Sequence, residues 1–182
     1  HQLEVELRQE TGDAALSAFW WGPGFDLDRD AQEPSRWYGE YWANQTLWWD
    51  PVVTLQGGDG VLDYQWTDGP PAGGIPVDHF SSRFRRTVDL GAGRWQFDVS
   101  SDDGVRLWVD GALVLEEWQD QVAVFTPTVS LMSGDHELQV EHYENLGWAN
   151  VGMSWEQVSE EPAAAGWVTA PISGTVVETC PI

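Results

Sequence analysis

Residues 94–111 read Arg-Trp-Gln-Phe-Asp-Val-Ser-Ser-Asp-Asp-Gly-Val-Arg-Leu-Trp-Val-Asp-Gly, and this stretch decides the fold. Polar and apolar residues alternate through its first six positions, as in a strand with one buried face. A second strand is predicted over 105–109. Asp110-Gly111 then predicts a tight hairpin, because both central residues of a type I′ turn need positive φ. The stretch therefore predicts three consecutive short strands.

The same period of two continues on both sides of this stretch. Leu138 and Val140 alternate with charged or polar neighbours, and so do the apolar residues of 149–155. Turn signals recur about every ten residues from Trp37 onward, in keeping with a chain that has 19 Gly and 10 Pro. No segment has helical spacing over three turns. We therefore expect an all-β fold, an antiparallel sandwich or barrel of about eight to ten strands.

The composition restricts the class of partner. Thirty Asp and Glu stand against eight cationic residues, all Arg, for a formal charge of −22. This charge repels phosphate backbones and anionic lipids, so nucleic acid and membrane insertion are not expected. Carboxylates are also the hard oxygen ligands that calcium prefers. A single Cys, Cys180, excludes an internal disulfide framework and a cysteine-based metal cluster.

The two ends of the chain differ from the middle. We predict an N-terminal extended segment and linker over 1–33, a sandwich over 34–157, and a linker with an extended segment over 158–182. Leu3, Val5 and Leu7 alternate with charged residues, which predicts a strand that could pair with a neighbouring copy. No apolar run approaches the roughly 20 residues of a bilayer span. His1 in place of Met indicates N-terminal processing, which would fit a removed secretion signal.

Asp102 and Asp103 are the residues that carry the chemistry. Neighbouring residues on a regular strand point to opposite faces, so the two carboxylates can share one ion only if the backbone bends sharply between them. The other interpretation is a tight turn at residues 101–104 whose carboxylates cap local N–H groups. Both interpretations remain open at this point.

Several motifs together resemble a known family. The resemblance covers about residues 37–156 and is to the domain family named for the fourteen-kilodalton piece of protective antigen, a β-sandwich also found in yeast flocculation adhesins and inserted in some glycosidases. The chain departs from the family pattern at Arg85-Arg86, where a small polar residue and Gly are usual. The residues that carry the resemblance are Trp37-Tyr38-Gly39-Glu40-Tyr41-Trp42-Ala43-Asn44, Asp63-Tyr64-Gln65-Trp66, Phe80-Ser81-Ser82-Arg83-Phe84, the string from Ser100 to Gly111, His142-Tyr143-Glu144-Asn145 and Trp155.

The resemblance implies a calcium site. In the sugar-binding members a cis peptide joins the two Asp, so we expect one between Asp102 and Asp103. A second calcium loop is expected at 144–149, with the side chain of Asn145 and nearby main-chain carbonyls as further ligands. Sugar hydroxyls would then occupy open positions on the ion.

Two Trp residues are candidates for sugar contact. Trp118 and Trp148 are expected in or next to the loops that flank the ion, where an aromatic face can stack on the apolar face of a pyranose. Packing in the core is the alternative for each. Carboxylate pairs at glycosidase spacing are inevitable among thirty acids, so they are no evidence for catalysis.

The function that follows is that of a binding module. We expect a non-catalytic, secreted or cell-surface module that binds a glycan or cell-surface polysaccharide through calcium. The alternative is a structural subunit of an extracellular filament or surface layer, assembled by strand exchange through its termini.

Overall fold

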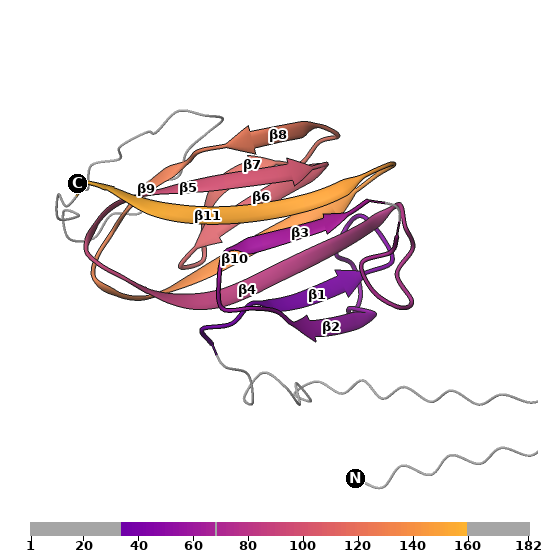
Figure 1. The fold of residues 1–182 in the computed structure, drawn as a ribbon, viewed down its shortest axis with the longest axis horizontal. Helices are drawn as coiled ribbons and strands as arrows, with labels where there is room; N and C mark the ends of the chain where they lie inside the picture. Colours follow the sequence, from indigo (N-terminus) through magenta and orange to yellow (C-terminus); the bar gives the residue numbers. More distant parts are fainter. Residues whose placement is uncertain (1–33, 68, 160–182) are drawn as a thin grey trace, which may run out of the picture. The chain divides into compact units, whose positions relative to one another are not determined.

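The computed structural model describes residues 34–67 and 69–159, and these residues form an all-β fold without helices (Figure 1). The strands are β1 (Tyr38–Trp42), β2 (Val53–Gln56), β3 (Leu62–Trp66), β4 (Phe80–Leu90), β5 (Gly93–Asp102), β6 (Gly104–Val109), β7 (Ala112–Glu117), β8 (Val122–Phe125), β9 (Thr128–Leu131), β10 (Gly134–Glu144) and β11 (Ala149–Ser159). None of the described residues belongs to a helix with the length and apolar composition needed to cross a membrane.

The strands form two antiparallel sheets. A six-stranded sheet has the order β2-β1-β4-β10-β6-β7, and a five-stranded sheet has the order β3-β11-β5-β8, with β9 also paired to β5. In Figure 1, β8 lies along the upper edge and β2 along the lower edge. Most neighbouring strands are distant in sequence, as in Greek-key sandwiches.

The predicted fold class is confirmed, and the strands expected at 94–99 and 105–109 are present within β5 and β6. The predicted number of strands was too low, since the described residues form eleven. The four-residue strands β2, β8 and β9 lie at sheet edges. Pro127 separates β8 from β9, although both pair with β5. Proline has no N–H to donate to a ladder, so it divides one edge into two pieces.

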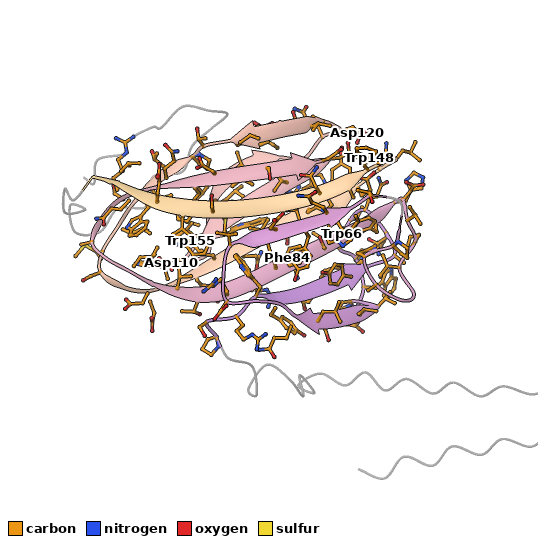
Figure 2. All side chains as sticks on the ribbon, in the orientation of Figure 1. Trp66, Phe84, Asp110, Asp120, Trp148 and Trp155 are labelled. Atoms are coloured by element: carbon orange, nitrogen blue, oxygen red, sulfur yellow. The ribbon has the colours of Figure 1, made fainter. Side chains whose placement is uncertain are left out.

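The core lies between the two sheets. Phe97 and Val99 of β5 have no exposed surface, and Trp95 packs against the same cluster from the edge, as the alternation predicted. Trp66 and Phe84, labelled in Figure 2, come from opposite sheets, and their stacked rings are 6.5 Å apart between centroids. Burial of such aromatic side chains supplies much of the apolar area that stabilises a sandwich.

At the departure from the family pattern, Arg85 lies on the outer face of β4, and Arg86 lies on the inner face that also carries Phe84 and Val88. Arg85 Nη2 lies 2.6 Å from Glu40 Oε2 on β1. The Arg86 guanidinium lies 5.5 Å from the ring centroid of Trp37 and 5.4 Å from that of Trp155. Both cations therefore have partners that suit a charged, planar group.

The predictions for the termini lie outside the described residues. These are the extended segment at 1–33, with the strand of Leu3, Val5 and Leu7, and residues 160–182 of the segment predicted at 158–182. The first two residues of that segment, Val158 and Ser159, continue β11.

Candidate metal centre

The Asp102–Asp103 corner joins the two sheets. Strand β5 of the five-stranded sheet ends at Asp102, and β6 of the six-stranded sheet begins at Gly104. The peptide bond between Asp102 and Asp103 is cis, which confirms the expectation from the resemblance. The turn from β10 to β11 makes the reverse crossing beside it, because Tyr143 pairs with Gly104 and Asn150 pairs with Asp102.

Three carboxylates converge at these two crossings. Asp102, Asp103 and Glu144 each offer one oxygen, and these oxygens all lie within 4.8 Å of one another. Asp103 is 7% exposed and Glu144 is fully buried, while Asp102 is partly exposed. The arrangement is therefore an acidic cluster with two buried members and one that faces outward.

Glu144 is the member that the sequence analysis missed as a ligand. Both of its side-chain oxygens are buried without a hydrogen-bond partner. It stands at the end of β10, two residues after His142 on the face that also carries Leu138 and Val140 toward the core. The sequence did contain a signal for Glu144: a charged residue continues an otherwise apolar face of the strand. Because a buried carboxylate is costly without a partner, such a residue is a candidate metal ligand.

The pKa values of all three acids are raised. Burial and the neighbouring Asp103 raise the pKa of Asp102. For Asp103, burial and the charge of Asp120 together raise the pKa more than the hydrogen bonds from the Asn145 and Gln121 backbones lower it. Burial, followed by the charges of Asp103, Asp102 and other acids, raises the pKa of Glu144 to about 8. The protein alone therefore opposes the ionisation of this cluster.

His142 supports the corner from the core side. Its Nε2 lies 2.9 Å from the carbonyl oxygen of Asp102, and its Nδ1 lies 3.3 Å from Ser82 Oγ. Burial of the ring lowers the pKa of His142 to about 4, so it is neutral. Since a carbonyl only accepts, Nε2 carries the hydrogen and Nδ1 accepts from the Ser82 hydroxyl. The imidazole thus fixes the Asp102 carbonyl.

Asn145 lies beside the acids, and its backbone N–H, its backbone carbonyl and both polar atoms of its side chain are in hydrogen bonds. Its backbone N–H donates to Asp103 Oδ2 at 2.8 Å, and its Nδ2 donates to Asp120 Oδ2 at 2.9 Å. Its Oδ1 accepts from Gln45 Nε2 at 3.1 Å. Tyr143 also donates to Asp120, at 2.6 Å. Asp120 and Gln45 were not named by the sequence analysis, because their loops meet Asn145 only in three dimensions.

The two predicted sugar-contacting Trp residues differ in exposure. Trp148 is 68% exposed and lies at the same end of the sandwich as Asp120, as Figure 2 shows. Trp118 is half-buried. Its ring centroid lies 4.8 Å from that of Tyr143, and the Arg106 guanidinium lies 4.1 Å from its ring. Trp118 thus packs against Tyr143 and Arg106, while Trp148 presents most of its surface to solvent, and sugar contact stays a prediction for both.

Fold and site together define a two-sheet β-sandwich domain with an acidic cluster where the chain crosses between sheets. The chain belongs to the PA14 domain family, whose family model matches residues 33–174. PA14 is the protective-antigen family to which the sequence motifs pointed, so that identification is confirmed.

The similar proteins carry this domain within longer chains. The Anti-sigma-I factor RsgI3 of Acetivibrio thermocellus is 29% identical over 126 residues, which cover 68% of this chain and 19% of that protein. A solved anti-sigma factor domain-containing protein from Clostridium clariflavum is 25% identical, with a TM-score of 0.60, over 80% of this chain and 48% of the other. The chain thus spans about half or less of these relatives.

A third comparison concerns the fold alone. A solved structure described as the PA14 sugar-binding domain from RTX adhesin has a TM-score of 0.58 at 19% identity. The match covers 67% of this chain and 89% of that one. The sandwich is therefore shared over nearly the whole of that domain.

Proposed function

We propose that this chain is a non-catalytic module that binds carbohydrate through a calcium ion held by Asp102, Asp103 and Glu144. The main observation behind this proposal is that both side-chain oxygens of Glu144 are buried without a hydrogen-bond partner, next to two further carboxylates. A bound cation would supply the missing partner for these oxygens. Asn145 remains a predicted fourth ligand, since its Oδ1 has a second lone pair beyond the one that Gln45 uses.

The donor set suits calcium better than softer metals. All three side chains offer carboxylate oxygens. Among the described residues, no His or Cys contributes a ligand atom to this cluster. Calcium accepts six to eight oxygens in irregular geometry, which a corner between two sheets can provide. The three acids raise one another's pKa values, and a bound divalent cation would lower these pKa values again. When bound, calcium offers open coordination positions to sugar hydroxyls.

The relatives support recognition as the activity. The RTX adhesin domain is described as sugar-binding, and it shares this fold. The exposed Trp148, three residues after Asn145 on the same loop, provides an aromatic face for a sugar ring. We therefore propose a glycan, presented outside the cell or on a cell surface, as the partner, and we place the protein in that extracellular setting.

Calcium titration with thermal unfolding tests the metal site. We expect saturable stabilisation by calcium that is lost in the Asp102→Asn/Asp103→Asn variant. The matched control is Asp89→Asn/Asp135→Asn, which removes the same charge from two exposed acids that face each other on β4 and β10. This control should keep the full calcium response. Equal responses in the two variants would disprove the site.

A glycan array tests the sugar. The protein is applied to an array of mono- and disaccharides with calcium and again with a chelator, and binding of these short glycans is expected only with calcium. The Asp102→Asn/Asp103→Asn variant should lose this binding, while the control variant retains it. Binding that survives the chelator, or a calcium-loaded protein that binds no glycan, would contradict the proposed function.

A further inference from the structure

Two adjacent tryptophans stand exposed on the loop between β1 and β2. Trp48 is 68% exposed and Trp49 is 78% exposed, whereas Trp37, just before β1, and Trp42, its last residue, are at most 2% exposed. The rings of Trp48 and Trp49 stack with centroids 5.3 Å apart and an angle of 29° between planes. Indole rings left in water are unfavourable, so a paired exposure needs an explanation beyond folding.

The loop that carries this pair is held by its own hydrogen bonds. Asn44 Oδ1 accepts from the Thr46 N–H at 2.9 Å, from the Thr46 hydroxyl at 3.0 Å and from the Trp48 N–H at 3.3 Å. Asn44 Nδ2 donates to the Trp48 carbonyl at 3.0 Å. A single side chain thus closes the loop, as Asn commonly does in turns.

The loop is also tied to the sandwich below it. Trp42 Nε1 donates to the Trp49 carbonyl at 2.8 Å, and Ser81 Oγ donates to the Asn44 carbonyl at 2.6 Å. Leu47 and Trp49 have positive φ, 56° and 70°, in a region that side chains other than Gly rarely adopt. Such conformations persist only where surrounding contacts maintain them, and they often mark functional positions.

The same loop contacts the candidate metal centre. Gln45 Nε2 donates to the Glu144 carbonyl and to Asn145 Oδ1, both at 3.1 Å. Leu146 and Trp148, on the loop after Asn145, are 65% and 68% exposed. Exposed aromatic and apolar side chains are therefore carried by both of the loops that Gln45 joins.

We propose that Trp48 and Trp49 form a stacking platform for a neutral polysaccharide, whose neighbouring sugar units reach the calcium site. This rests on the proposed function and deepens it, because it makes the ligand a chain of sugars and not a single sugar. Indole faces fit the apolar faces of pyranose rings. The net charge of −22 opposes an anionic polymer, which leaves neutral chains as the favoured class.

The test compares a polymer with its own monosaccharides. Hydroxyethylcellulose, galactomannan and arabinoxylan are used as probes in affinity electrophoresis and calorimetry, each with calcium. At least one polymer is expected to bind. Trp48→Ala/Trp49→Ala should weaken binding of that polymer by about tenfold or more, the expected loss of two aromatic contacts. Binding of the constituent monosaccharide to the metal site should be unchanged.

Two further variants keep the test independent of folding. Trp48→Tyr/Trp49→Tyr retains aromatic faces and should retain most of the polymer affinity. Val122→Ser/Val124→Ser removes two other exposed apolar side chains, which are 76% and 68% exposed on β8, and should have no effect. Asp102→Asn/Asp103→Asn should abolish monosaccharide binding and leave a weaker, chelator-insensitive affinity for the polymer.

The outcomes separate the platform from the calcium site. Polymer binding that depends on calcium but not on either Trp overturns the platform and leaves the proposed function standing. Polymer binding that needs the Trp pair but not calcium supports the platform and overturns the calcium function. The platform is also overturned if none of the three polymers binds, if polygalacturonate binds more tightly than they do, or if the alanine variant converts a dimer into a monomer.

Discussion

Glu144 has a carboxylate that the fold buries without a hydrogen-bond donor. Because burial and nearby acids raise its pKa to about 8, the metal-free protein must keep it protonated at neutral pH. An unfolded Glu ionises freely at that pH, so this residue costs up to about 3 kcal/mol of stability at pH 7. Glu144→Gln should therefore raise the unfolding temperature of the metal-free protein.

The same substitution should have the opposite effect on calcium binding. A neutral amide is a weaker ligand than a carboxylate, so the stabilisation by calcium should shrink. Thermal unfolding with chelator and with calcium measures both effects. Glu137→Gln, an exposed residue of the same strand, is the matched control and should change neither value by more than about 0.5 kcal/mol. A loss of stability in the metal-free Glu144→Gln protein would contradict this account.

Gly104 allows β6 and β10 to approach at the corner. A Cβ atom at this position would overlap the ring of Tyr143, whose hydroxyl donates to Asp120. Gly104→Ala should destabilise the fold by about 1 to 3 kcal/mol, as overpacking does, and should weaken calcium binding by displacing Tyr143. Denaturant unfolding measures the first effect. Gly91→Ala, where a Cβ would meet open space, should be nearly neutral, and an equal cost at both positions would refute the argument.

At this scale the sequence revealed only part of the site. Asp102, Asp103 and Asn145 belong to recognisable motifs, and the cis bond was expected from them. Glu144 was quoted within a motif but not recognised as a ligand. Gln45 reaches Asn145 across 100 positions of sequence, and no local pattern encodes such a contact.

At the scale of strands, charged side chains form a ladder across the six-stranded sheet. Arg83 lies between Glu40 and Glu141, with N–O distances of 3.6 Å and 2.8 Å. Arg106 lies between Glu141 and Glu116, at 3.6 Å and 3.1 Å. Each pair faces directly across neighbouring strands in the register of β1, β4, β10, β6 and β7. The ladder thus connects five strands by alternating charge.

A second link fastens the β6–β7 hairpin to β10. His136 Nδ1 lies 2.7 Å from Asp110 Oδ2 in the turn, and His136 Nε2 lies 2.8 Å from the Met132 carbonyl. Both partners are acceptors, so the ring satisfies both bonds only when it is protonated. Burial alone would lower the pKa of His136, but these bonds and the charges of Asp110 and Asp135 raise it overall.

The stability of the fold should therefore depend on pH through His136. Because its folded pKa lies above the unfolded value of 6.5, the stabilisation is complete below about pH 6 and is lost as pH rises through the folded pKa. The wild type should exceed His136→Gln by about 1 to 2 kcal/mol at pH 5.5, the value of a charged hydrogen bond partly screened by solvent. Denaturant unfolding from pH 5.5 to 9 measures the difference, which should vanish at the upper end. A difference that grows with pH would reverse the assignment.

Strand positions followed from alternation, but strand neighbours did not. Trp95, Phe97 and Val99 were placed correctly because period two is a local property. The pairing of β4 with both β1 and β10 depends on the whole core and on which faces can be buried together. Short edges such as β2, with most of its residues exposed, carry little hydrophobic signal, so the number of strands was underestimated.

At the scale of the whole chain, the net charge of −22 gives any cation two ways to stabilise the protein. Mobile salt screens the mutual repulsion of surface acids, an effect that grows gradually with ionic strength. A calcium site acts by mass action instead and saturates once it is filled. Raising sodium chloride from 10 to 300 mM should therefore increase the unfolding temperature of the wild type and of Asp102→Asn/Asp103→Asn alike.

Adding calcium at constant ionic strength then separates stabilisation by binding at a site from stabilisation by screening. In 300 mM sodium chloride, where the screening length is only about 5 Å, a millimolar divalent salt adds little further screening. Any remaining calcium stabilisation must come from a site, and magnesium, which requires shorter and more regular coordination, should reproduce little of it. Unfolding temperatures measured with both ions decide the matter. If high sodium chloride abolishes the stabilisation of the wild type by calcium, the acids at the sheet crossing contribute only to the net charge of the protein. The carboxyl group of Glu144 is then neutralised by protonation and not by a bound metal ion.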